Sequence, residues 1–150
     1  MIQFWTQGFS IKSASWLLVS AISIAVTGCG ESAKPWEVVV PVKGTVTYRG
    51  KPVSGAQISL YPVNAEFPSS VIPSATSVQN GEFSVGTYGT DDGAPAGEYR
   101  VAIVWHPLVD KGSGGSRGDN VLPPKLANPE TSGLKVVVHS EETTLPSFNL

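Results

Sequence analysis

Few residues that commonly carry chemistry stand at spacings that could support it. The two histidines, His106 and His139, lie far apart, and neither has a second metal ligand at the spacing of a zinc site. The one cysteine is Cys29. We therefore expect both histidines to be solvated residues at strand ends. We also expect no nucleophile elbow, no catalytic residue, no metal ion and no cofactor.

Two short motifs have alternative interpretations. Residues 91–93, Asp-Asp-Gly, offer carboxylates to calcium, but calcium takes about six to eight oxygen ligands and no further acidic residues follow at suitable spacings. A turn is the simpler interpretation. Residues 117–119, Arg-Gly-Asp, match an adhesion tripeptide, which a glycine-rich segment reaches easily by chance.

The elements that position such residues begin after an N-terminal leader. Residues 1–15 carry one charge, Lys12, and an apolar run of 11 residues, Trp16–Val26, follows. The run is shorter than the roughly 20 apolar residues needed to span a membrane, and its layout is typical of a secretory signal peptide. The next residues, through Cys29, resemble the bacterial lipobox, with Val26 in place of the usual leucine.

We therefore predict a signal peptide over residues 1–28 and lipidation of Cys29. Several acyl chains together anchor a protein far more firmly than one, so the predicted partner is a membrane. Gly30 in place of aspartate resembles lipoproteins sorted to an outer membrane, here facing the periplasm. The alternative is ordinary secretion, with Cys29 near the cleavage site by chance.

Without the leader the chain carries nine basic and twelve acidic residues, a formal charge of −3 with the signs interspersed. This pattern excludes a basic surface for nucleic acid. Residues 29–37 predict a polar tether that includes the lipidated cysteine, and residues 38–150 predict one β-domain.

Alternating apolar and polar residues predict strands over 42–48 and 56–61, joined as a hairpin by turn residues 50–55. The strongest predicted strand is 98–105, with Tyr99, Val101, Ile103 and Trp105 facing inward.

A second predicted hairpin joins strands 74–79 and 82–87 through Asn80-Gly81, with Phe83 and Val85 inward. Two further strands, around 134–138 and 148–150, complete a seven-stranded antiparallel sandwich.

The segment from His106 to Asn128 interrupts this alternation and contains Gly112, Gly114, Gly115 and Gly118. Irregular loops of such length are usually functional or disordered. We predict that this segment is the mobile part of the molecule and carries its specificity. The alternative is a passive linker.

Three segments resemble the carboxypeptidase regulatory-like family: residues 42–56 (VKGTVTYRGKPVSGA), 81–83 (GEF) and 93–101 (GAPAGEYRV). Together with residues 128–134 they are similar to the short lipoproteins of planctomycete bacteria. The resemblance covers about residues 40–150. It implies a transthyretin-like, seven-stranded Greek-key β-sandwich and, for most members, no assigned activity. We expect a non-catalytic module that makes protein or glycan contacts.

Two alternatives remain. A carbohydrate-binding module would use aromatic side chains as stacking platforms; the candidates are Trp36, Tyr61, Tyr88 and Trp105. An enzyme similar to 5-hydroxyisourate hydrolases is the more distant alternative. Those transthyretin-like enzymes end in Tyr-Arg-Gly-Ser, whereas here Tyr48-Arg49-Gly50 lies near the start of the domain and is followed by Lys51.

Overall fold

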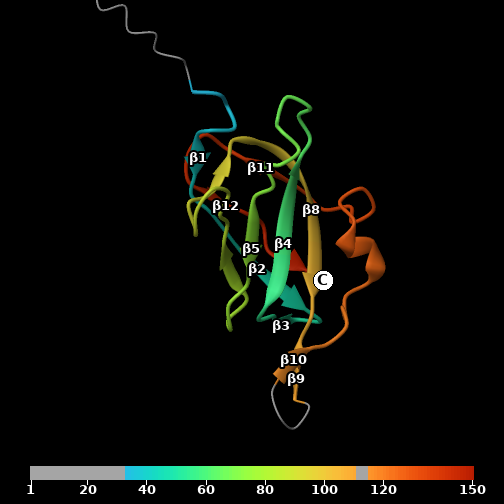
Figure 1. Cartoon of the computed structure of the whole chain (residues 1–150). Helices are drawn as coiled ribbons and strands as arrows, with labels where there is room; N and C mark the ends of the chain where they lie inside the picture. The colour runs from blue at the N-terminus through green and yellow to red at the C-terminus, as the bar shows by residue number, and fades with distance from the viewer. Residues whose placement is uncertain (1–32, 111–114) are drawn as a thin grey trace, which may run out of the picture. The chain divides into compact units, whose positions relative to one another are not determined.

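The computed structural model describes residues 33–110 and 115–150, which form an all-β fold (Figure 1). Strands hold 43% of the described residues and helix 4%, which confirms the predicted class. The predicted signal peptide and the lipidation site, Cys29, lie outside the described residues, as does the start of the predicted tether. Within the described part, no helix has the length and apolar character to cross a membrane.

A four-stranded antiparallel sheet has the order β11-β8-β4-β5. Its central pair follows from strict alternation, because Ile58 lies opposite Ile103 and Leu60 opposite Val101, all fully buried. The strands are β4 (Ala56–Pro62), β5 (Ser74–Thr76), β8 (Gly97–Trp105) and β11 (Lys135–Val138).

A second sheet is built around β2 (Val42–Tyr48). It pairs antiparallel with β3 (Lys51–Pro52) and β6 (Glu82–Ser84), and parallel with β12 (Thr143–Thr144) and β13 (Phe148–Asn149). The expectation of a purely antiparallel fold was therefore wrong. The chain leaves β11 at the end of the molecule where β2 begins, so the strands that follow run in the direction of β2.

The first predicted hairpin was also wrong, because β2 and β4 lie in different sheets. Arg49 and Gly50 both have positive φ, 51° and 75°, and form the tight two-residue turn that pairs β2 with the short β3. The hairpin therefore closes on residues 51–52. The chain then crosses to the other sheet through Gly55.

The second predicted hairpin keeps its turn but not its pairing. Gly81 has φ of 79°, and the Asn80 side chain accepts a hydrogen bond from the Glu82 backbone N–H at 3.1 Å. However, β5 pairs with β4 and β6 pairs with β2. The two strands separate because each has a longer partner in its own sheet.

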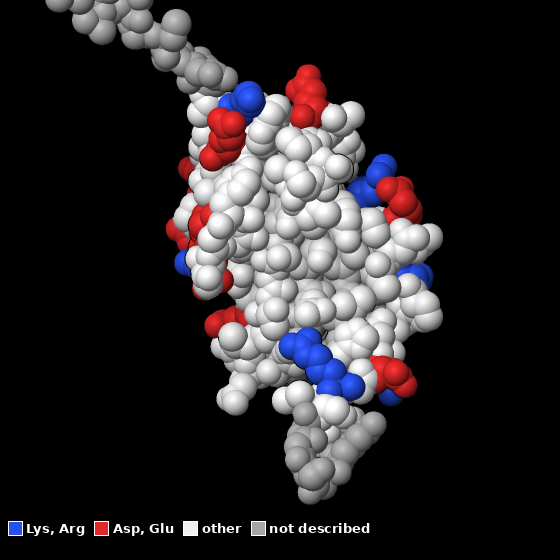
Figure 2. Space-filling view, in the orientation of Figure 1, with Lys and Arg blue, Asp and Glu red and all other residues white. Residues whose placement is uncertain are grey.

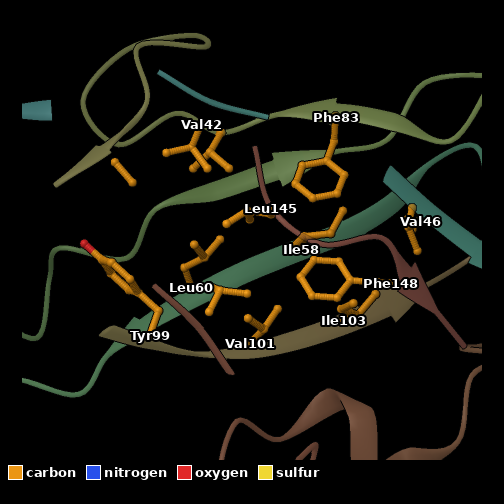
Figure 3. Close-up of a cluster of buried hydrophobic side chains, with 14 of the residues drawn as sticks. Val42, Val46, Ile58, Leu60, Phe83, Tyr99, Val101, Ile103, Leu145 and Phe148 are labelled. Carbon is orange, nitrogen blue, oxygen red and sulfur yellow. The ribbon is translucent and has the colours of Figure 1, made fainter. Parts of the chain in front are cut away.

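The buried side chains of both sheets form one core (Figure 3). The rings of Phe83 and Phe148 stack with their centroids 6.0 Å apart. The inward orientation predicted for Phe83, Tyr99, Val101 and Ile103 is confirmed, because each is at most 3% exposed, whereas Trp105 is only half-buried.

The described part of the segment 106–128 is structured, which corrects the prediction of an irregular loop. It forms the ribbon β9 (Leu108–Asp110) and β10 (Gly115–Arg117), followed by the short helix η1 (Pro124–Ala127). Leu122 and Leu126 belong to the hydrophobic core. The Asn120 side chain accepts the backbone N–H groups of Trp105 and Leu122 at 3.0 and 3.2 Å.

Residues just before 38 also pack on the sheets. Residues 34–37 form a turn, and the ring of Trp36 packs edge-on against Phe67 at 6.2 Å. Just beyond, β1 (Val39–Val40) pairs with β7 (Ala94–Pro95).

Candidate functional site

A groove of about 620 Å³ crosses the polar face of the β2 sheet and reaches β5. It opens where β5 and β6 separate. These segments are joined by backbone hydrogen bonds between Ser74 and Gly86 and between Val78 and Glu82, and between these points Thr76 and Ser84 line the groove. The second predicted hairpin paired these two strands along their length, so the sequence did not predict the groove between them.

The polar lining of the groove follows from the alternation along β2. Lys43 and Thr45 face outward because the residues on either side, Val42, Gly44 and Val46, face the core. Lys43 Nζ lies 3.0 Å from Glu142 Oε1, and the hydroxyls of Thr45 and Ser147 are 2.6 Å apart. Such a lining can donate and accept hydrogen bonds with a polar ligand.

The inner wall of the groove is set by one close contact. The Phe83 ring packs directly over the Cα of Gly44, its partner across the β2–β6 pair, so any side chain at Gly44 would collide with the ring. Phe83 thereby separates the polar groove from the core.

A second hollow of about 500 Å³ adjoins the groove and shares Thr76, Ser84 and Asp91 with it. Its rim, residues 86–92, is organised by Asp92, whose carboxylate accepts the backbone N–H groups of Thr87, Tyr88 and Gly89 at 2.7, 3.1 and 2.9 Å. Residues 91–93 are thus a turn, and Asp92 serves the backbone. The described residues contain no group of three or more acidic, histidine or cysteine side chains that could hold a metal.

This turn predicts a pH-dependent stability. Burial acts to raise the pKa of Asp92, but the N–H bonds outweigh it and hold the pKa below the ordinary value of 3.8. The stabilisation is therefore present above that value and is lost as the pH falls through the folded pKa. Asp92→Asn should lower the free energy of unfolding at pH 7 by about 1–2 kcal/mol, and by less at pH 3.

Urea denaturation at the two pH values checks this prediction, with Asp91→Asn as the matched control. Asp91 is the exposed neighbour in the same turn, and asparagine tolerates its positive φ of 56°. A loss for Asp92→Asn that is the same at both pH values would show that its carboxylate is not the stabilising group.

The four candidate aromatic residues do not form one stacking platform. The Tyr88 hydroxyl donates to the Trp36 carbonyl, which places these two together. The Trp105 indole N–H donates to the Ser54 carbonyl at 2.9 Å, and its ring packs against Tyr48. Tyr61 lies on the outer face of β4, opposite Arg100. Figure 2 shows the side of the molecule on which β4 lies in front, and few charged side chains lie at its centre.

The remaining candidates are also separated. His106 follows the last residue of β8, whereas His139 follows Val138, which pairs with the first residue of β8. The Nδ1 atom of His106 lies 2.9 Å from the Gly118 carbonyl oxygen. The Tyr48-Arg49-Gly50 segment forms the β2–β3 turn, with the Arg49 guanidinium 5.1 Å from the Tyr48 ring centroid.

One sequence pattern was missed. Residues 114–118 read Gly-Gly-Ser-Arg-Gly, which has the spacing of a nucleophile elbow. In the structure Ser116 lies in β10 opposite Val109, not at a strand-to-helix turn. Its hydroxyl is buried and has no hydrogen-bond partner among the described residues. The Arg-Gly-Asp tripeptide overlaps this pattern, and its Gly118 N–H donates to the Pro107 carbonyl at 2.9 Å.

No family model and no curated protein matches the chain. Similar solved structures include a 9R-lipoxygenase from Cyanothece (12% identity, TM-score 0.40), covering 79% of this chain and 17% of that one. A DUF3823 family protein from Parabacteroides merdae shows 20% identity and a TM-score of 0.35 over 71% of this chain and 44% of the other. A candidate carbohydrate-binding protein from Pseudomonas aeruginosa shows 14% identity and a TM-score of 0.38 over 77% and 92%.

The chain therefore spans less than half of the lipoxygenase and DUF3823 chains. At TM-scores below 0.5, these likenesses carry no argument about the function of this protein.

Proposed function

We propose that the protein is an exported lipoprotein of the bacterial outer membrane, held by acyl chains on Cys29 and presenting a non-catalytic β-module to the periplasm. The lipobox-like sequence carries this proposal. It follows an apolar run of signal-peptide length and contains the only cysteine of the chain. Its position also fits, because the first turn of the domain, residues 34–37, begins five residues after Cys29.

We further propose that the module is a Greek-key sandwich of the carboxypeptidase regulatory-like, transthyretin-like kind. Strands consecutive in the chain alternate between the two sheets, from β2 to β4 and β5, then to β6, then to β8. The buried Tyr99 hydroxyl donates to the Pro95 carbonyl at 2.7 Å, four residues earlier. Such a tyrosine corner is characteristic of Greek-key sandwiches.

The groove over β2 is the proposed contact site of the module. Its hydroxyl-rich lining suits a hydroxylated ligand, so a glycan is the first class to test and a polar protein segment the second. Thr45→Val should weaken glycan-array binding at least about fivefold, since it leaves Ser147 without its hydroxyl partner. Thr47→Val is the control. Thr47 lies two residues farther along β2, outside the groove lining, is half-buried like Thr45, and its hydroxyl donates to the Asn149 side chain.

The anchoring half of the proposal predicts a large change for Cys29→Ser. Serine cannot form the thioether to diacylglycerol, so the variant should remain an uncleaved precursor or leave the lipid fraction. Detergent phase partitioning with sodium dodecyl sulfate gel electrophoresis measures both outcomes. A Cys29→Ser product that is processed normally and still partitions with lipid would contradict the anchor. Measurable 5-hydroxyisourate turnover would contradict the non-catalytic assignment.

A further inference from the structure

The end of the domain at which the described chain begins carries an apolar, aromatic surface. Trp36 is half-buried, and its neighbours Val38 and Tyr88 are 55% and 57% exposed. Val63, 41% exposed, belongs to the same end, because its N–H bonds the Glu98 carbonyl at the start of β8. We call Trp36, Val38, Val63 and Tyr88 the proximal patch.

The proximal patch is firmly attached to the fold. Trp36 packs against Phe67, and Phe67 packs against the buried Tyr99, with centroids 6.2 and 6.4 Å apart. The Tyr88 hydroxyl holds the Trp36 carbonyl, and Lys34 Nζ lies 5.8 Å from the Trp36 ring centroid. Exposed apolar side chains on a rigid base commonly mark a contact surface.

The covalent chain restricts what this surface can meet. Three residues lie between Cys29 and Ala33, the first described residue, so the two Cα atoms can be at most about 14 Å apart at full extension. If Cys29 is lipidated, the start of the domain cannot move farther than this from the headgroups. The opposite end is remote, because Trp105 lies six residues beyond Tyr99 along β8, about 20 Å away.

We propose that the proximal patch docks on the lipid surface and fixes the orientation of the domain; this inference rests on the proposed lipidation of Cys29. Tryptophan and tyrosine favour the membrane–water interface, where an apolar ring and a polar tip are both accommodated. The β9–β10 end of the domain, at the far end of β8, then faces away from the membrane.

The docking is apolar in origin. Glu37 and Glu66 lie beside Lys34 at the proximal patch, and Glu98 lies with Arg100 and Lys135 around the hollow that Val63 lines. The charges of the two signs balance, so anionic lipid offers no net attraction. Figure 2 likewise shows acidic and basic groups side by side where the described chain begins. Neutral phosphatidylcholine should therefore suffice, and added salt should not release the patch.

Site-directed spin labelling of the full lipoprotein in phosphatidylcholine vesicles tests this proposal. Lipidation consumes the only thiol, so a nitroxide on V38C reports the proximal patch alone. The matched control is V121C, because Val121 has a comparable exposure of 44% and its N–H bonds the Trp105 carbonyl at the far end of β8. Collisions of the V38C label with an aqueous nickel reagent should be at least about threefold rarer than those of the V121C label.

Equal accessibility of the two labels would overturn the docking. So would protection that appears only with anionic lipid or disappears in high salt. V63C supplies a second reporter from the neighbouring loop should V38C perturb the turn. Labelling of the unsubstituted chain distinguishes failure of the docking from failure of the anchor. If Cys29 in that chain takes up the nitroxide, the cysteine is not lipidated.

Discussion

Replacing Gly93 by alanine should destabilise the domain by at least about 3 kcal/mol. Gly93 has a φ of 103°, a conformation that residues with side chains rarely adopt, and an added Cβ would lie far inside the van der Waals contact distance to the Val40 carbonyl oxygen. Because that oxygen belongs to the backbone of β1, the clash cannot be relieved by a rotamer change. The β1–β7 pair would have to separate, which would disturb the N-terminal turn and the proximal patch.

Urea denaturation measures this loss, and Gly55→Ala provides the matched control. Gly55 also has a positive φ, 80°, but its added Cβ would meet nothing within 4 Å. The control should therefore lose only about 1–2 kcal/mol, the cost of the backbone conformation alone. Equal losses for the two variants would show that the close approach of Val40 carries no energetic weight.

The second large effect is expected for Ile103→Ala, at about 2–5 kcal/mol. Ile103 is fully buried in β8, opposite Ile58, and its side chain lies among core residues of both sheets (Figure 3). Removing three carbon atoms there leaves a cavity in addition to the lost apolar burial. The measurement is again the free energy of unfolding in urea.

Val137→Ala is the control for the core. Val137 also lies in the four-stranded sheet, in β11, but it is 49% exposed. Its truncation should cost less than about 0.5 kcal/mol. A comparable loss at both positions would mean that the core does not lie between the two sheets.

Sequence alternation predicted the strands well where a segment was long and half-buried. The inward positions of β8, and the two buried valines of β11, Val136 and Val138, follow directly from a period of two residues. Glycine at positive φ likewise marked the turn at Gly81. These features depend on local geometry, which a single sequence contains.

Partner choice between strands was not predictable from local patterns. The turn residues predicted that β2 pairs with β4 and that β5 pairs with β6. In the structure β4 pairs with β5 and β8, and β6 pairs with β2. Hairpin signals describe the reversal of the chain and not the pairing of its longer strands. The groove was missed for the same reason, because it lies where β5 and β6 separate.

The segment from His106 to Asn128 shows a second limit. Its glycines and prolines suggested an irregular loop, whereas the structure in its described part depends on Leu122, Leu126 and the side chain of Asn120. Two apolar residues are enough to pack this polar segment against the core. The composition of the segment does not reveal that a core lies there for them to contact. The specificity predicted for this segment stays a prediction.

Mass spectrometry of the mature N-terminal peptide tests whether Cys29 anchors the protein to a membrane. We expect a peptide that begins at Cys29 and carries the mass of a diacylglycerol thioether, with residues 1–28 absent. An unmodified Cys29, or a mature chain that begins at another residue, would rule out the lipid anchor.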